Sequence, residues 1–215
     1  MALMVCCHIS PISLSPLPSR IERIEGHASL VISGDQGTAR SKFSFLFDLP
    51  SRGRIDVTGA LGSVLYRIFI HDGDAYFIVP SKKVYWQGRE EEIIDKFMGF
   101  RLNLDEMVNL LSGNWDREEV LRNEDLENWS FVRDRKGRII SGRRQDLRFD
   151  IEEFIGDTPF ARRLIFEHPL STGQMKVLSI NLNRPIKENV FSKKFVMKYQ
   201  SKTWKEIQEL LNHAR

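Results

Sequence analysis

Few side chains of this sequence stand at spacings that would support catalysis or metal binding. The five histidines are scattered singly, so no two of them could place metal ligands on one helix face. No nucleophile elbow, phosphate-binding loop or dinucleotide-binding glycine pattern occurs. The acidic run at 90–92 is typical of a helix start, where carboxylates suit the helix dipole. The sequence therefore predicts a protein that is not an enzyme and that uses no metal or cofactor.

The side chains that do form a pattern are apolar. Phe43, Phe45 and Phe47 alternate along one predicted strand, so their rings share one face of a sheet. Neighbouring strands and two helices add aliphatic and aromatic residues to that face. The predicted lining of an apolar cavity is Phe43, Phe45, Phe47, Ile55, Val57, Ile68, Phe77, Val79, Ile94, Phe97, Met107 and Leu111. A closed hydrophobic core is the alternative interpretation of the same pattern.

A second apolar feature is a leucine in a turn. Residues 54–58 and 64–70 have strand character, and the segment between them holds Ala60, Leu61 and Gly62. Turns are normally polar because their backbone faces water. Leu61 therefore either folds back as a plug or projects towards lipid or a hydrophobic partner.

Basic residues are concentrated between positions 133 and 148. Alternation along a hairpin would put several of them on one face, where they could meet phosphates or acidic headgroups. Aspartates interleave with them, so a solvated hairpin is the alternative interpretation. The net charge of +3 is too small to indicate a nucleic-acid partner. The basic residues concerned are Arg133, Arg135, Lys136, Arg138, Arg143, Arg144 and Arg148.

The N-terminal 24 residues differ from the rest of the chain. Both cysteines of the sequence, Cys6 and Cys7, follow a short apolar start, and a stretch rich in Ser and Pro comes next at 8–19. An apolar segment, a cysteine and an extended tether resemble a truncated lipoprotein-type N-terminus, with Cys6 as the acylated residue. The alternative is a disordered N-terminus with two incidental cysteines. With no cysteine beyond position 7, a disulfide framework is excluded.

The elements that must position these residues form a β-rich domain over 25–215. Two helices, at 89–98 and 103–111, interrupt a run of antiparallel strands, and a terminal amphipathic helix covers 203–213. The fold class is therefore mainly β (α+β), an open antiparallel barrel over about 25–200 with helices across its mouth. The predicted strands are 28–33, 38–49, 54–58, 64–71, 75–79, 84–87, 129–133, 138–141, 147–151, 162–168, 176–182 and 195–199.

Residues 38–113 resemble LolB, the outer-membrane lipoprotein that receives other lipoproteins from the periplasmic carrier LolA. The match comprises the aromatic strand, the strand leading into Leu61-Gly62-Ser63, and Gly73 at the next hairpin. It continues through the helix start at 91–94 to Gly99 and the helix that ends at Gly113. The sequence departs from the family at Ala60, where a proline is usual, and at Leu110, where a tryptophan is common.

The resemblance implies an apolar cavity for acyl chains, with Leu61 as the residue that helps to insert lipoproteins into a membrane. It implies three partners: the acyl chains of lipoproteins, a LolA-like carrier, and the inner leaflet of the bacterial outer membrane. The protein would be lipid-anchored there and face the periplasm. The alternative function is a periplasmic carrier of lipids or other hydrophobic ligands, or an envelope-assembly module, with the same fold but without receptor activity.

Overall fold

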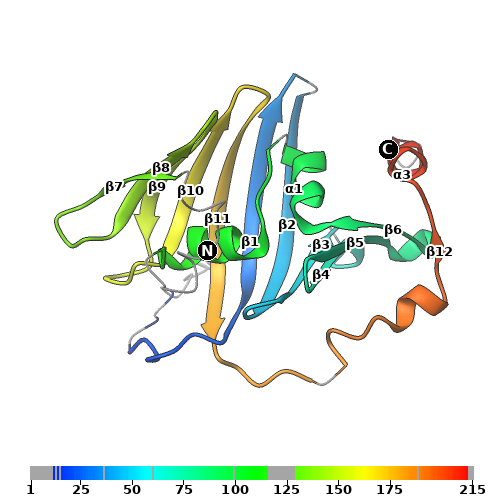
Figure 1. Cartoon of the computed structure of the whole chain (residues 1–215), viewed down its shortest axis with the longest axis horizontal. Coiled ribbons are helices and arrows are strands. Elements are labelled where there is room, and N and C mark those ends of the chain that lie inside the picture. The colour runs from blue at the N-terminus through cyan, green and yellow to red at the C-terminus, as the bar shows by residue number, and fades with distance from the viewer. Residues whose placement is uncertain are drawn as a thin grey trace, which may run out of the picture.

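One sheet of twelve strands organises the chain in the computed structural model, which describes residues 12, 14, 16–35, 37–59, 61–98, 100–115, 129–187 and 189–212. The strand order is β12-β6-β5-β4-β3-β2-β1-β11-β10-β9-β8-β7, so the two edge strands do not pair and the sheet stays open (Figure 1). This confirms the predicted fold class. The strands are β1 (Arg23–Gly34), β2 (Gly37–Asp48), β3 (Arg52–Thr58), β4 (Val64–His71), β5 (Asp74–Val79), β6 (Val84–Arg89), β7 (Ser130–Arg133), β8 (Ile139–Arg144), β9 (Leu147–Phe154), β10 (Ala161–His168), β11 (Ser171–Leu182) and β12 (Gln200–Ser201).

Two meanders meet at one seam in the middle of this sheet. β1 to β6 follow one another as antiparallel neighbours, and β7 to β11 do the same. The halves join where β1 pairs with β11, with Ala28 opposite Val177 and a register shift beside it. The seam lies at the centre of the curved sheet in Figure 1. One continuous sheet therefore carries side chains from both ends of the sequence on the same face.

Three helices are described: α1 (Glu90–Met98), α2 (Leu104–Ser112) and α3 (Trp204–Asn212). α1 starts with three glutamates, which favour the positive end of the helix dipole. α2 begins with a capping box between Asn103 and Glu106 and ends at Gly113, whose φ of 67° lies in the left-handed region. A Cβ at Gly113 would lie 2.6 Å from the Pro159 carbonyl oxygen, so a larger residue would clash there.

Both faces of the β4–β6 region are covered. All three helices contribute to the core on the concave face, through residues such as Ile93, Val108 and Ile207. The opposite face is covered by residues 186–187 and 189–199, whose Phe191 and Phe195 pack on Phe69. The predicted strand at 195–199 is wrong, because residues 194–197 form the 3-10 helix η2 (Lys194–Met197). Phe195 of η2 and Tyr199 beyond it are four residues apart, a spacing that fits both a helical turn and strand alternation.

The chain after β11 wraps around one edge of the sheet. It crosses the outer face, adds β12 beside β6 as a parallel strand, and continues into α3 on the concave face (Figure 1). The short 3-10 helix η1 (Pro80–Lys82) joins β5 to β6 near this edge. None of the described helices is long and apolar enough to cross a membrane.

Candidate functional site

The β3–β4 loop presents Leu61 to solvent with 98% of its surface exposed. The loop closes through its own backbone: the Gly62 N–H donates to the Gly59 carbonyl at 3.0 Å, and the Gly59 N–H donates to the Ser63 carbonyl at 2.9 Å. Gly62 has a φ of 77°, which glycine adopts without strain. Leu61 therefore projects rather than folding back as a plug. Ala60 lies outside the described residues, and a role of this loop in membrane insertion stays a prediction.

The predicted cavity residues share the concave face but lie in a packed core. Six of them are buried in one cluster: Phe45, Phe47, Ile68, Phe77, Val79 and Leu111. Four are half-buried against that cluster: Phe43, Ile55, Ile94 and Met107. Val57 is half-buried and pairs with Phe43, and the side chain of Phe97 lies outside the described residues. The structure shows this face filled by protein, and its occupation by a lipid stays a prediction.

Burial on the concave face decreases towards the Leu61 loop. Cross-strand neighbours on β2, β3 and β4 form rows on this face. In the row furthest from the loop, Phe47 and Ile70 are almost fully buried. In the row nearest to it, the paired residues Phe43, Val57 and Tyr66 are all half-buried. Val57 stands at the end of β3 and Tyr66 near the start of β4, next to the loop, and Phe43 lies beside Val57 on β2. An apolar path therefore leads from the core towards Leu61, and it is most open at the loop end.

α3 is one of the helices that cover the concave face, and the sequence patterns did not assign it to the site. The Trp204 ring packs edge-on against Phe77 at 5.4 Å and against Trp86 at 5.5 Å between ring centroids. Lys96 of α1 places its ammonium group 5.1 Å from the centre of the Trp86 ring, within cation–π distance. The period-two pattern of β6, with Val84 and Trp86 on one face, was the available signal for Trp86.

α2 is attached to the second half of the sheet through a buried carboxylate. Glu106 is 1% exposed, and it accepts a hydrogen bond from Trp129 Nε1 at 2.8 Å. It forms an ion pair with Arg144 of β8, and its other oxygen accepts from the Asn103 backbone N–H at 3.0 Å. Arg144 also lies 4.9 Å from the Trp129 ring centre. In the sequence, Arg144 belongs to the basic segment at 133–148, and no pattern predicts a role for Glu106 in the site.

Most of the basic segment is engaged in contacts within the protein. Arg138 pairs with Asp134, Arg148 with Asp150, and Arg144 with Glu106. Arg133 and Arg143 donate hydrogen bonds to backbone carbonyls within their own hairpins. These contacts favour the solvated-hairpin interpretation over a row of cations available to phosphates.

Two cavities lie beside the core. One of about 790 Å³ lies between α1, α2 and the β8–β9 turn, with Glu90, Asp95 and Arg144 in its lining. The other, of about 310 Å³, lies on the outer face and includes Arg54 and Asp56. Phe45 is the one predicted cavity residue in either lining. Within the described residues, no group of three or more His, Cys, Asp or Glu side chains could hold a metal ion.

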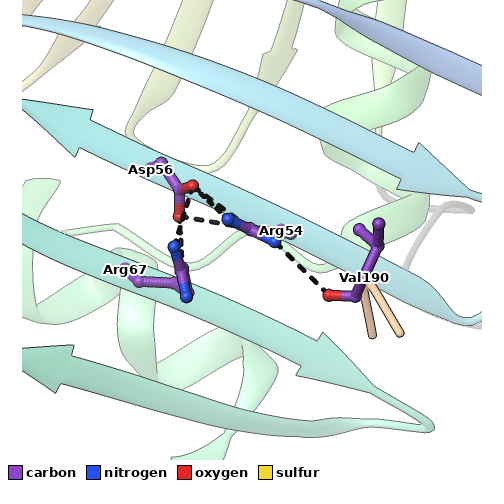
Figure 2. A network of polar contacts seen from close by, with 4 residues as sticks. All are labelled: Arg54, Asp56, Arg67 and Val190. Atoms are coloured by element: carbon purple, nitrogen blue, oxygen red, sulfur yellow. Dashed lines mark hydrogen bonds and ion pairs between the residues drawn. The ribbon is translucent and has the colours of Figure 1, made fainter. Parts of the chain in front are cut away.

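Asp56 forms the centre of the polar network on the outer face (Figure 2). Its oxygens accept from Arg54 Nη2 and from Arg67 Nε, both at 2.6 Å, and Arg54 Nη1 donates to the Val190 carbonyl at 3.4 Å. Burial by itself raises the pKa of Asp56, but hydrogen bonds and charges of the two arginines outweigh it and lower the pKa below its ordinary value. The network thus joins three strand residues to the segment that covers the outer face.

We expect Asp56→Asn to destabilise the protein at neutral pH. A carboxyl whose pKa is lowered by folding stabilises above its unfolded pKa of about 4, and that stability is lost as the pH falls through the folded-state value. The difference in unfolding free energy between the wild type and Asp56→Asn should therefore shrink as the pH falls below about 4. Urea unfolding at several pH values measures it, and Asp146→Asn, at an exposed position, is the control. A pH-independent difference would contradict this assignment.

The fold is similar to that of two solved structures. A LolA superfamily protein from Nitrosomonas europaea superposes with a TM-score of 0.52 at 13% identity, covering 81% of this chain and 91% of that chain. A DUF1329 family protein from Desulfovibrio piger superposes with a TM-score of 0.51 at 12% identity, with the same two coverages. No family model matches the sequence, and no curated protein sequence matches it.

Proposed function

We propose that this chain is a non-catalytic, lipid-handling protein of the bacterial envelope that accepts lipoproteins from a LolA-like periplasmic carrier and assists their insertion into the outer membrane. The observation that carries the proposal is the 98% exposure of Leu61 at the open end of an apolar concave face. The LolA superfamily fold and the sequence resemblance to LolB support it. The cargo would be the acyl chains of a lipoprotein.

Binding of an acyl chain on this face requires the helices to yield space. Each buried methylene contributes about 0.8 kcal/mol, so a chain can be held without special polar chemistry. The half-buried row of Phe43, Val57 and Tyr66 is the place of entry, because fewer core contacts must be lost there. Release needs the bilayer to bind the chain more tightly than this face does, which is a difference in affinity rather than a catalytic step.

We further propose that the protein is anchored in the outer membrane through acylated Cys6 and faces the periplasm. Cys6 and the tether that follows it lie outside the described residues. The order of an apolar start, a cysteine and a Ser/Pro-rich stretch supports this proposal. Mass spectrometry of the native protein should show a diacylglyceryl-modified cysteine at the N-terminus. An unmodified terminus that still carries Met1 would remove the proposal.

The experiment that tests the function is transfer of a labelled lipoprotein from a LolA-type donor. The purified protein should take up the lipoprotein from the donor and then deliver it to liposomes that contain no other acceptor. Binding of a fluorescent fatty acid, measured in parallel, separates the two candidate functions. Binding of the fatty acid without transfer would favour a periplasmic carrier of hydrophobic ligands. Absence of both would contradict lipid handling.

A further inference from the structure

Cations border the Leu61 loop on both sides. Lys42 of β2 pairs with Thr58, the last residue of β3. Arg40, two residues before Lys42, lies on the same face of β2. On the other side of the loop, η1 and Lys83 connect β5 to β6. Arg67, near the start of β4, pairs with Ile78, near the end of β5. This connection therefore lies at the same end of the strands as the start of β4. The residues Arg40, Lys42, Lys82 and Lys83 are called the basic rim.

The charges of the basic rim are not neutralised locally. All four side chains are exposed, and none forms an ion pair with another residue in the described part of the chain. The carboxylate nearest along the sheet, Asp56, is bound by Arg54 and Arg67. Gly37, at the start of β2, lies about 10 Å from Arg40 and about 17 Å from Lys42 at the usual rise per residue, and Asp35 lies beyond it in the turn. A partner that meets Leu61 would therefore meet a surface of one sign.

The backbone holds this rim at a fixed place relative to the loop. The Lys83 N–H donates to the Pro80 carbonyl at 3.2 Å, and the Lys83 carbonyl accepts from Gln200 of β12 at 2.9 Å. Thr58 Oγ1 donates to the Lys42 carbonyl at 3.3 Å, beside the start of the loop. Hydrogen bonds thus tie the residues on both sides of the apolar tip to the neighbouring strands.

We propose that the Leu61 loop and the basic rim together form a docking surface for a bilayer rich in anionic phospholipid. The proposal rests on the proposed function, and it names the lipid class that the loop meets. A leucine can enter the boundary of the hydrocarbon while lysine and arginine side chains stay at the level of the headgroups. Each contribution is weak alone, and the two together select a negatively charged surface.

The test is binding of the unacylated full-length protein to sedimented phosphatidylcholine vesicles with and without 30% phosphatidylglycerol. Because each cation near an anionic surface contributes about a fivefold factor in partitioning, Lys82→Glu/Lys83→Glu should reduce binding to the anionic vesicles by at least about 25-fold. Lys42→Glu should act in the same direction from the other side of the loop. Raising the salt concentration should weaken wild-type binding to anionic vesicles.

The matched control is Lys194→Glu/Lys198→Glu, which reverses two exposed charges on the covering segment of the outer face. It should leave binding nearly unchanged. Equal losses in the two double variants, or wild-type binding that does not depend on phosphatidylglycerol, would overturn the proposal. In the second case, lipoprotein transfer into neutral liposomes would still support the proposed function. Anionic binding without transfer to any liposome would instead retain the docking surface and remove the proposed function.

Discussion

Leu61→Glu will leave folding intact and reduce delivery of lipoproteins to membranes by about 10- to 100-fold. Burial of a leucine side chain contributes about 1.5–3 kcal/mol, and a carboxylate resists entry into hydrocarbon. In the folded chain the same side chain is 98% exposed, so its loss should change the unfolding free energy by less than about 0.5 kcal/mol. Delivery is measured by transfer of the labelled lipoprotein into liposomes, and uptake by transfer from the donor. Uptake should change much less than delivery.

Two variants control for this effect. Leu61→Phe keeps an apolar side chain at the tip and should retain delivery. Met197→Glu places the same charge at another exposed apolar position, 89% exposed in η2, and should also retain it. The opposite pattern, in which Leu61→Glu unfolds the protein while delivery by the remaining folded fraction is normal, would mean that Leu61 stabilises the fold and has no role at the membrane.

Arg144→Met should destabilise the protein by about 3–5 kcal/mol. The substitution leaves the Glu106 carboxylate, which is 1% exposed, without its ionic partner, and removal of one member of a buried pair costs about this much. At this chain length the expected fall in the melting temperature is about 6–20 °C. Thermal unfolding followed by circular dichroism measures it. Because Glu106 also caps α2, the helix should lose protection from hydrogen exchange first.

A double-mutant cycle separates the buried pair from general effects at β8. Adding Glu106→Gln to Arg144→Met removes the uncompensated charge, so the double variant should lose less stability than the sum of the two single variants. Arg148→Met provides the matched surface control, since the side chains of Arg148 and Asp150 are 55% and 32% exposed, and it should cost less than about 1 kcal/mol. Strict additivity in the cycle would show that Glu106 and Arg144 do not depend on each other.

The strand pattern was predictable because alternation of apolar residues depends on local geometry. Phe43, Phe45 and Phe47 lie on one face of β2, as expected, and α1 and α2 start and end within one residue of the predicted bounds. The exception at η2 shows the limit of that argument. Phe195 packs on Phe69 and Tyr85, and Tyr199 packs on Phe195, but so few residues cannot distinguish a helical turn from a strand.

The arrangement of the site depends on contacts between distant segments, which sequence patterns do not contain. Trp204 packs on Phe77 although the terminal helix carried no sign of its destination. Glu106 was predictable as a helix-capping residue, but its pairing with Arg144 depends on how α2 crosses β8. The composition of the basic rim was visible in the sequence, but its two halves come together only through the strand register.

The seam between β1 and β11 sets an order of assembly for the chain. Hydrogen bonds there join residues 161 positions apart, such as the Glu22 N–H and Asn183 Oδ1. β1 to β6 and β7 to β11 can each form as successive hairpins, but β11 gains its second neighbour only when it pairs with β1, and the long loop between these two strands is costly to close. β12 and α3 come last in the chain order, and both pack on strands of the first half. The apolar concave face is therefore complete only after nearly the whole chain has been made, and folding of this protein should be slow compared with that of a helical domain of the same size.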